Sequence, residues 1–264
     1  MKKGIYGWKY IKESADYGNW VPLNLLYTIL GIILILLISS LFPIFLFIRI
    51  ILWVVTGLLL LPFCYLIYLY YHFSAHNKRL QYKIWNLVIQ NLPWNGQGKA
   101  LDIGTGAGPL AIELAKKFPR SIVWGIDYWG KLWNYSKNRC EINARIEGVA
   151  NQVVFQKASA SKLPFKNGEF DAIVSNFVYH EVRDIKDKMK LINESFRVLK
   201  KGGAFSLQDT LKNQKKFGTV EDLIRQIKEW GVQEVNFIET ADEIPMPNFL
   251  KFELKTMGLL YGIK

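Results

Sequence analysis

Two long apolar segments dominate the first third of the chain. No charged residue occurs in residues 21–48 or in residues 50–71, and Arg49 alone separates the two segments. The hydrocarbon core of a bilayer, ~30 Å thick, needs about 20 apolar residues of helix. Two serines and a proline interrupt the first segment, and the second fits one span. The pattern therefore predicts a transmembrane helical hairpin with spans near Leu23–Leu41 and Ile50–Tyr71.

Basic residues flank this hairpin on both sides and predict its orientation. They are Lys2, Lys3, Lys9 and Lys12 before it and Lys78, Arg79 and Lys83 after it. The positive-inside rule then places both termini in the cytoplasm. A cleaved signal peptide has a much shorter apolar region, and a soluble buried helical pair would need a polar face to show to water. We therefore expect a multi-pass membrane protein with two spans, in which the domain that follows the hairpin is cytoplasmic.

After the hairpin the pattern changes to short apolar runs that alternate with helical stretches. This alternation is typical of an α/β protein with a parallel sheet and helices on both faces. We expect strands at 99–103, 121–126, 153–156, 172–175, 204–207, 235–238 and 259–263. We expect helices at 78–92, 109–118, 131–147, 187–199 and 220–230, the fourth of them ended by Lys200-Lys201-Gly202-Gly203. The predicted organisation is a cytoplasmic segment (1–20), the hairpin (21–72), an amphipathic linker helix and joint (73–98) and an α/β domain (99–264).

Composition and charge narrow the possible classes of protein. Half of the residues are hydrophobic and 21% are charged, which excludes a disordered chain. The net charge is +12, of which residues 1–83 contribute half, without a long basic run elsewhere. This distribution suits an anionic membrane surface better than nucleic acid. Two cysteines without a C-x-x-C motif exclude a disulfide scaffold and predict no zinc or other metal site.

A glycine-rich turn follows the first predicted strand of the α/β region. It is part of Leu101-Asp102-Ile103-Gly104-Thr105-Gly106-Ala107-Gly108. Such a turn lets a ligand approach the backbone at a helix N-terminus. A dinucleotide fingerprint would need its third glycine at position 109, which is Pro109, and no phosphate-loop motif is present. Asp127 ends the second predicted strand, where an acid can accept hydrogen bonds from both ribose hydroxyls of an adenosine; a helix N-cap is the alternative.

These features together carry a resemblance to a known family. The chain from about Lys83 to Lys264 resembles the class I S-adenosylmethionine-dependent methyltransferases, and among them the small-molecule ubiquinone/menaquinone methyltransferases. The segments that carry the resemblance are Leu101–Gly108, Gly125–Asp127, Ala158–Ser175 and Arg197–Gly203. The resemblance implies a Rossmann-like sheet of seven strands with an antiparallel last strand, which residues 259–263 can supply.

The resemblance also implies where S-adenosyl-L-methionine binds. Gly104 and Gly106, in one turn with Thr105 and Gly108, would pack against its methionine part, and Asp102 would lie near its ammonium group. Asp127 would hold the ribose hydroxyls, with Tyr128 or Trp129 against the adenine. Ser159 and Ala160 fall where the family contacts the adenine edge, although many members have Asp in place of Ser159. Ser175 and Asn176 would line the path from the sulfonium to the acceptor.

Methyl transfer from a sulfonium depends mainly on positioning and on the exclusion of water, because the electrophile is already activated. A base is needed only when the acceptor loses a proton. His180 and Tyr179 are the candidate catalytic residues, with Glu181 and Asp209 as further possibilities; for each, a role in packing or in a loop is the alternative. The Asp/Asn-Pro-Pro-Tyr signature of methylation on nucleobases is absent from residues 175–179, which argues against a nucleic-acid substrate.

The sequence therefore predicts a membrane-anchored methyltransferase whose acceptor is a small, lipophilic molecule, such as an isoprenoid quinone precursor or a lipid head group. The predicted partners are this acceptor and the lipid bilayer. A methyltransferase of a membrane-associated protein and a non-catalytic sensor of S-adenosylmethionine are the alternatives. The linker helix at 78–92 either holds the mouth of the site against the head groups or packs on the catalytic domain.

Overall fold

The structure is a computed structural model that describes residues 14–43, 45–73, 80–130 and 135–264. These residues form two compact units. One is Gly18–Asn86, and the other consists of Leu87–Lys264 together with the described residues up to Tyr17. Six of the flanking basic residues on which the predicted orientation depends, all except Lys83, lie outside the described part of the chain.

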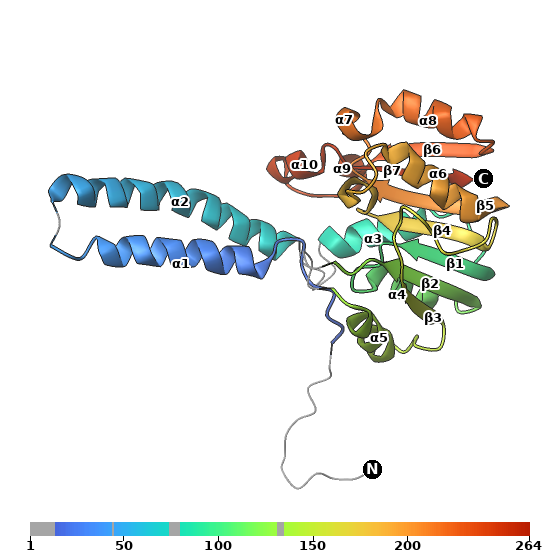
Figure 1. The fold of residues 1–264 in the computed structure, drawn as a ribbon, viewed down its shortest axis with the longest axis horizontal. Helices are drawn as coiled ribbons and strands as arrows, with labels where there is room; N and C mark the ends of the chain where they lie inside the picture. Colours follow the sequence, from blue (N-terminus) through green and yellow to red (C-terminus); the bar gives the residue numbers. More distant parts are fainter. Residues whose placement is uncertain (1–13, 44, 74–79, 131–134) are drawn as a thin grey trace, which may run out of the picture. The chain divides into compact units, whose positions relative to one another are not determined.

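The unit Gly18–Asn86 contains two apolar helices, α1 (Leu23–Ser39) and α2 (Leu46–His72), which run antiparallel (Figure 1). Among the described residues, only α2 is long and apolar enough to cross a membrane; it has 27 residues, and an 18-residue window within it has a mean hydropathy of 2.5. Helix α1 has 17 residues and therefore rises about 25 Å, short of the ~30 Å hydrocarbon core. The structure thus supports one candidate span, and the predicted pair of spans is not shown.

Both helices differ from the predicted spans at the loop between them. Helix α1 ends at Ser39, before the predicted Leu41, and Ser40 closes its last turn by donating from its hydroxyl to the carbonyl of Leu37 at 2.6 Å. Helix α2 begins four residues earlier than predicted and includes Arg49. The Arg49 guanidinium donates to the carbonyl of Phe42 at 3.2 Å, so one of its hydrogen-bond donors has a partner in the loop.

The second unit is built on a sheet of seven strands in the order β3-β2-β1-β4-β5-β7-β6. Strand β7 is antiparallel to both of its neighbours, and the other pairs are parallel. The strands are β1 (Gly98–Ile103), β2 (Ser121–Asp127), β3 (Val153–Lys157), β4 (Phe170–Asn176), β5 (Leu199–Asp209), β6 (Glu234–Glu239) and β7 (Gly258–Ile263). The predicted seven-stranded sheet with an antiparallel last strand is confirmed.

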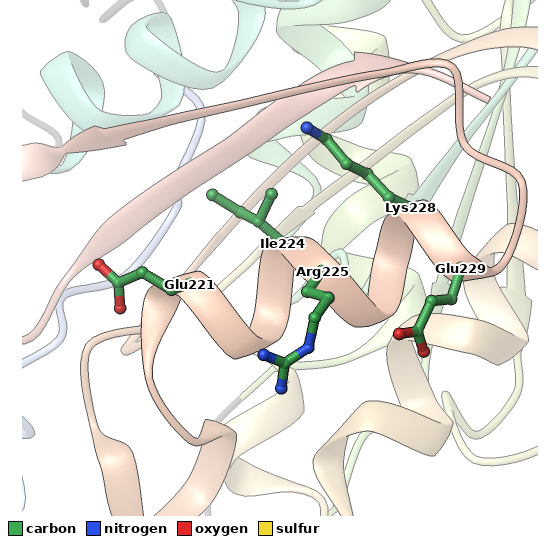
Figure 2. A pocket seen from close by; sticks show the side chains of 5 residues that line it. All are labelled: Glu221, Ile224, Arg225, Lys228 and Glu229. Carbon is green, nitrogen blue, oxygen red and sulfur yellow. The ribbon is translucent and has the colours of Figure 1, made fainter.

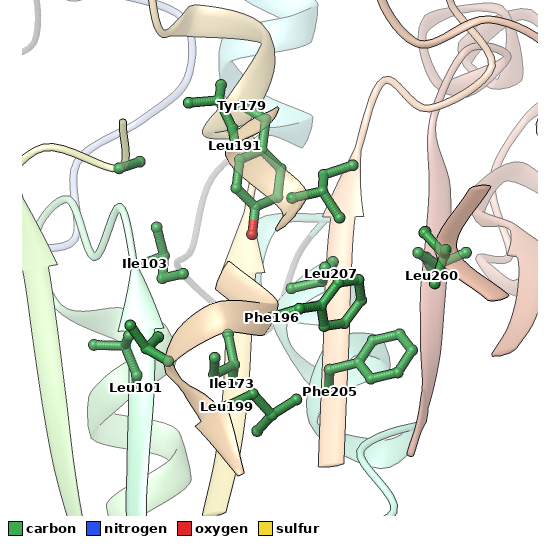
Figure 3. Packing of buried hydrophobic residues seen from close by; sticks show 14 of the residues in the cluster. Leu101, Ile103, Ile173, Tyr179, Leu191, Phe196, Leu199, Phe205, Leu207 and Leu260 are labelled. Carbon is green, nitrogen blue, oxygen red and sulfur yellow. The ribbon is translucent and has the colours of Figure 1, made fainter. Parts of the chain in front are cut away.

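Helices cover both faces of this sheet. They are α3 (Leu80–Gln90), α4 (Pro109–Lys117), α5 (Lys137–Ile146), the 3-10 helix η2 (Tyr179–Glu181), α6 (Lys188–Val198), α7 (Gln214–Phe217), α8 (Val220–Glu229), α9 (Thr240–Glu243) and α10 (Asn248–Leu254). Because side chains alternate along a strand, Asp102 bonds to α4 on one face, whereas Ile103 belongs to the core on the other. Figure 3 shows this core, in which Leu191 and Phe196 of α6 pack with Leu207 of β5.

Three helices begin at a side chain that caps them. The Ser136 hydroxyl accepts from the amide of Arg139 at α5, and the Asp187 carboxylate and Thr219 hydroxyl act in the same way at α6 and α8. Such caps satisfy amides that have no partner inside the helix. The predicted helix at 131–147 is therefore shorter, because its described part begins only after Ser136.

The segment Lys200–Gly203 follows the end of a helix, as predicted, but it also lies within a strand. Helix α6 stops at Val198, and the next residue already belongs to β5. The end of the chain pairs here: the Gly202 amide donates to the carbonyl of Lys264 at 2.6 Å, and the Lys264 amide donates to Gly203 at 2.9 Å. Pairing with a segment about 60 residues away thus extends the strand, predicted at 204–207, back to Leu199. The elements η2, α7, α9 and α10 were not predicted.

The linker helix, predicted at 78–92, is α3. Leu87, Val88 and Ile89 near its end are buried. The Ser206 hydroxyl of β5 donates to the carbonyl of Val88 at 2.8 Å. These contacts favour the alternative in which the helix packs on the domain over the one in which its apolar side rests on lipid head groups.

Candidate active site

The glycine-rich turn connects the carboxyl end of β1 to α4. Gly104, Gly106 and Gly108 have φ angles of 74°, 56° and 89°, a region that L side chains rarely adopt. The amides of Gly104 and Thr105 both donate to the carbonyl of Ile126 in β2, at 2.8 Å. A Cβ atom on Gly104 would lie 2.0 Å from Val178 Cγ2, just past β4. The turn is therefore held between β2 and the segment after β4, at the point where the strand order reverses.

Asp127 at the end of β2 braces this turn. One carboxylate oxygen accepts from the Gly106 amide at 2.9 Å and the other from the Trp129 amide at 2.7 Å. Burial raises the pKa of the Asp127 carboxyl. Each carboxylate oxygen has two acceptor positions, so each retains capacity for a further donor. Asp127 is not the N-cap of α5, because Ser136 caps that helix.

Of the two aromatic residues after Asp127, Trp129 lies at the turn. Its indole Nε1 donates to the carbonyl of Gly106 at 2.9 Å, and its backbone has a φ of 46°, unusual for a residue other than glycine. The Tyr128 side chain is 65% exposed, and the Lys157 ammonium lies 5.3 Å from its ring centre. Trp129 is therefore the better placed of the two to meet a ligand on the turn.

Asp102 is buried under the turn on the side of α4. One of its oxygens accepts from the Thr105 hydroxyl at 2.6 Å and from the Ala111 amide at 3.1 Å. Burial raises the pKa of this carboxyl to about 7. Asp102 thus connects the glycine-rich turn to the start of helix α4. Its predicted contact with the ammonium group of the cofactor stays a prediction.

The remaining predicted cofactor residues lie on two neighbouring segments. Ser159 and the buried Ala160 follow β3, next to the end of β2, and the Ser159 hydroxyl bonds with that of Ser161 at 2.8 Å. The Ser175 hydroxyl is fully buried and donates to the carbonyl of Ile103 at 3.0 Å, so it joins β4 to β1. The side-chain oxygen of Asn176 is buried and has no hydrogen-bond partner among the described residues.

His180 and Asp209 form a hydrogen-bonded pair. Asp209 is fully buried at the end of β5, and its carboxylate lies 2.6 Å from His180 Nδ1. The same carboxylate accepts from the Tyr179 amide at 2.8 Å, which holds η2 against β5. The other ring nitrogen, Nε2, lies 3.2 Å from a carboxylate oxygen of Glu181, whose side chain is partly exposed. An imidazole oriented by a buried carboxylate is the arrangement of a general base.

Tyr179 lies away from this pair. Its side chain is fully buried in the core (Figure 3), and its hydroxyl lies 2.9 Å from that of Ser195 in α6. Burial raises the pKa of this phenol well above its usual range. The geometry favours a packing role for Tyr179 over the predicted role in proton transfer.

Sequence reasoning missed two features at this edge of the sheet. Phe177 has a φ of 57°, and its ring lies 6.2 Å from that of His180. Positive φ in a bulky residue is strained and is concentrated at functional sites. Cys140 of α5 donates from its sulfur to the carbonyl of Gly106 at 3.1 Å. No motif marks either residue, because both roles depend on contacts across the fold.

A pocket of about 690 Å³ lies elsewhere, on α8 alone (Figure 2). Its lining residues are Glu221, Ile224, Arg225, Lys228 and Glu229. None of them is a predicted site residue. Within the described ranges, no three His, Cys, Asp or Glu side chains gather as a possible metal-binding group.

Residues 101–207 match the model of a protein family described as a methyltransferase domain. This match identifies the segment as a methyltransferase domain. S-adenosyl-L-methionine is the methyl donor of such domains.

Curated relatives of this methyltransferase domain include enzymes named for quinone biosynthesis. The chain is 31% identical over 117 residues to a ubiquinone/menaquinone biosynthesis C-methyltransferase of Geobacter sp. (strain M21), covering 44% of this chain and 47% of the relative. It is 35% identical over 107 residues to a demethylmenaquinone methyltransferase of Roseiflexus castenholzii, covering 40% of each. The chain thus spans about half the length of the curated relatives it matches.

Solved structures share the fold. A geranyl diphosphate C-methyltransferase from Streptomyces coelicolor, solved with S-adenosyl-L-homocysteine, superposes with a TM-score of 0.54 at 13% identity, covering 71% of this chain and 77% of that one. At this identity the likeness concerns the fold alone.

Proposed function

We propose that this chain is a membrane-anchored methyltransferase that transfers a methyl group from S-adenosyl-L-methionine to a small, lipophilic acceptor. One observation carries the proposal. The braced glycine turn and the His180–Asp209 pair both lie at the carboxyl ends of the parallel strands, on either side of the point where the strand order reverses. Ligands of open α/β sheets bind at this position.

The residues around the turn fit the cofactor. Gly104 and Gly106 present bare backbone to its methionine part, and Asp127 has acceptor capacity left for the ribose hydroxyls. The adenine would lie between Trp129, Ser159 and Ala160. Asn176 offers a buried oxygen that has no partner in the described part of the chain. When bound, the cofactor supplies a methyl group on a sulfonium.

His180 would take a proton from the acceptor. Asp209 accepts at Nδ1 and so favours the tautomer that carries its hydrogen there. Nε2 is then the basic nitrogen, and the partly exposed Glu181 can turn away from it when an acceptor enters. A hydroxyl or an acidic C–H group of the acceptor would lose its proton to Nε2 as the new bond forms.

The membrane part of the proposal rests on the two apolar helices. Helix α2 meets the length and hydropathy of a span, and α1 is apolar throughout but shorter. We infer that both helices cross the bilayer as a hairpin. The short length of α1 would be accommodated by local thinning of the bilayer or by flanking side chains that extend to the head groups. The names of the curated relatives, which refer to quinone biosynthesis, support a lipophilic acceptor.

Transfer of label from methyl-labelled S-adenosylmethionine tests the proposed activity. The full chain, reconstituted in vesicles, is incubated with a lipid extract that contains reduced isoprenoid quinones lacking the methyl group. We expect label in the organic phase, and only when the extract is present. Label that runs with polypeptide would replace the proposal with protein methylation. Cofactor binding without any transfer would point to a sensor.

The topology can be tested with a reporter that is active only outside the cytoplasmic membrane. A fusion to residue 264 should give no signal, because a hairpin returns the chain to the cytoplasm. The same reporter inserted between α1 and α2 should give a strong signal and serves as the matched control. Signal from residue 264 would contradict two spans and would leave α2 as the single span.

Cofactor affinity should depend on pH through Asp102. With a pKa of about 7, this carboxyl ionises between pH 6 and pH 8, and its charged form attracts the ammonium group of S-adenosylmethionine. Affinity should therefore rise with pH by up to about tenfold over this range. Calorimetry at several pH values measures it. Asp102→Asn should abolish the slope, and 5′-methylthioadenosine, which lacks the ammonium group, should show none. A slope that persists in Asp102→Asn would assign it to another group.

A further inference from the structure

Asn143 of α5 makes contacts in two directions. Its side chain is buried, and its amide nitrogen donates to the carbonyl of Ala107 in the glycine turn at 2.9 Å. The same nitrogen donates to the carbonyl of Asp16 at 2.8 Å, and the side-chain oxygen accepts from the Asp16 amide at 2.9 Å. One buried amide thus joins the cofactor turn to a segment 127 residues earlier in the chain.

Further contacts fasten this N-terminal segment to the domain. The Arg139 guanidinium, one helical turn before Asn143, forms an ion pair with the Asp16 carboxylate and donates to the Asp16 carbonyl at 3.1 Å. Tyr17 is half-buried, and its burial together with the charges of Glu147 and Glu113 raises the pKa of its phenol. The segment 16–17, called here the docked segment, therefore contacts α5 at Arg139 and Asn143.

The same face of α5 controls the position of the turn. Cys140 holds the carbonyl of Gly106, and Asn143 holds the next carbonyl, that of Ala107. The first of these carbonyls belongs to Gly106, whose backbone has a positive φ and whose amide donates to Asp127, and the second belongs to the residue that follows it. Release of Asp16 would free the Asn143 amide to rotate, because two of its three hydrogen bonds are to that residue.

We propose that Asn143 is a positioning residue for the cofactor turn and that the docked segment sets its orientation. Cofactor affinity then depends on whether Asp16 and Tyr17 are in place. Because the chain continues from Tyr17 into α1 at Leu23, the attachment of the apolar helices can act on cofactor binding through this contact. The inference rests on the proposed function, in that the turn binds S-adenosylmethionine.

Binding of S-adenosyl-L-homocysteine to the full chain in detergent, measured by calorimetry, tests this proposal. Asn143→Ala should raise the Kd about five- to tenfold, the effect of one or two lost hydrogen bonds. The double variant Asp16→Ala with Arg139→Gln changes mainly surface groups and should raise the Kd about two- to fivefold. Glu141→Ala removes an exposed ion pair with Lys137 on the same helix and should leave the Kd unchanged.

Two further measurements separate positioning from a merely structural role. In the Asp16/Arg139 variant, the KM for S-adenosylmethionine should rise while kcat at saturation stays constant. In the wild type, S-adenosylhomocysteine should slow hydrogen exchange at the Asp16 amide, because coupling between two sites is reciprocal.

Each outcome decides the proposal. Wild-type affinity in both the Asn143 and the Asp16/Arg139 variants would overturn it, while the proposed function would stand. An effect of Asn143→Ala alone, without slower exchange at Asp16, would overturn the role of the docked segment. If Asn143→Ala does not fold, the Asp16/Arg139 variant and the exchange measurement decide. Failure of the wild type to bind the cofactor at all would instead refute the function on which the inference rests.

Discussion

Replacement of His180 by glutamine will lower kcat for methyl transfer by about a hundredfold or more, the usual contribution of a positioned base. Glutamine retains a polar side chain but cannot take up a proton at neutral pH. The Kd for S-adenosyl-L-homocysteine should stay within about twofold of the wild type, because His180 lies beyond the residues that brace the turn. Steady-state rates at saturating concentrations of both substrates measure the first effect, and calorimetry measures the second.

His72→Gln is the matched control. His72 lies at the end of α2 and packs on Tyr68, with 4.2 Å between the ring centres. This variant should retain the wild-type kcat. Asp209→Asn should also slow transfer, because an amide can donate to Nδ1 and so favour the wrong tautomer. Unchanged kcat in His180→Gln would mean that the acceptor gives up no proton to this residue.

Removal of the Asp127 carboxylate will weaken cofactor binding by about tenfold or more. A hydrogen bond to a charged acceptor contributes roughly 1.5–3 kcal/mol, and two ribose hydroxyls would depend on this carboxylate. Asp127→Ala also leaves the amides of Gly106 and Trp129 without their acceptor. Calorimetric titration with S-adenosylmethionine and its demethylated product measures the loss. Asp171→Ala is the control, because Asp171 sits at the start of β4 and bonds to Lys99 and Lys200 instead.

A second titration distinguishes ribose binding from support of the turn. A 2′-deoxy analogue should bind the wild type less tightly than the parent compound, but the two should bind Asp127→Ala equally. If the analogue shows the same deficit in both proteins, Asp127 braces the turn without contacting that hydroxyl. Unchanged affinity of Asp127→Ala for the parent compound would remove Asp127 from the site altogether.

The sequence predicted the sheet well because its signal is local. Strands buried on both faces are nearly continuous apolar runs, and all seven predicted strands overlap an observed one. The glycine turn and Asp127 could be found for the same reason, since each is defined by its place at the end of a strand. The prediction missed the first part of β5, which begins at Leu199 because Gly202 and Gly203 pair with the end of the chain. It also missed the short helices α7, α9 and α10, which have too few residues to show a helical period.

The sequence alone thus determined the fold class, the apolar character of residues 21–72 and the position of the glycine turn at which we propose that the cofactor binds. The tertiary structure decided which polar residues meet. His180 bonds with Asp209 across 29 residues, and Asn143 joins the turn to Asp16 across 127 residues. It also turned Tyr179 into the core, one position away from a histidine that points to β5. Local patterns record how a segment folds, but such pairings depend on the order of strands in the sheet and on contacts between elements far apart in the chain.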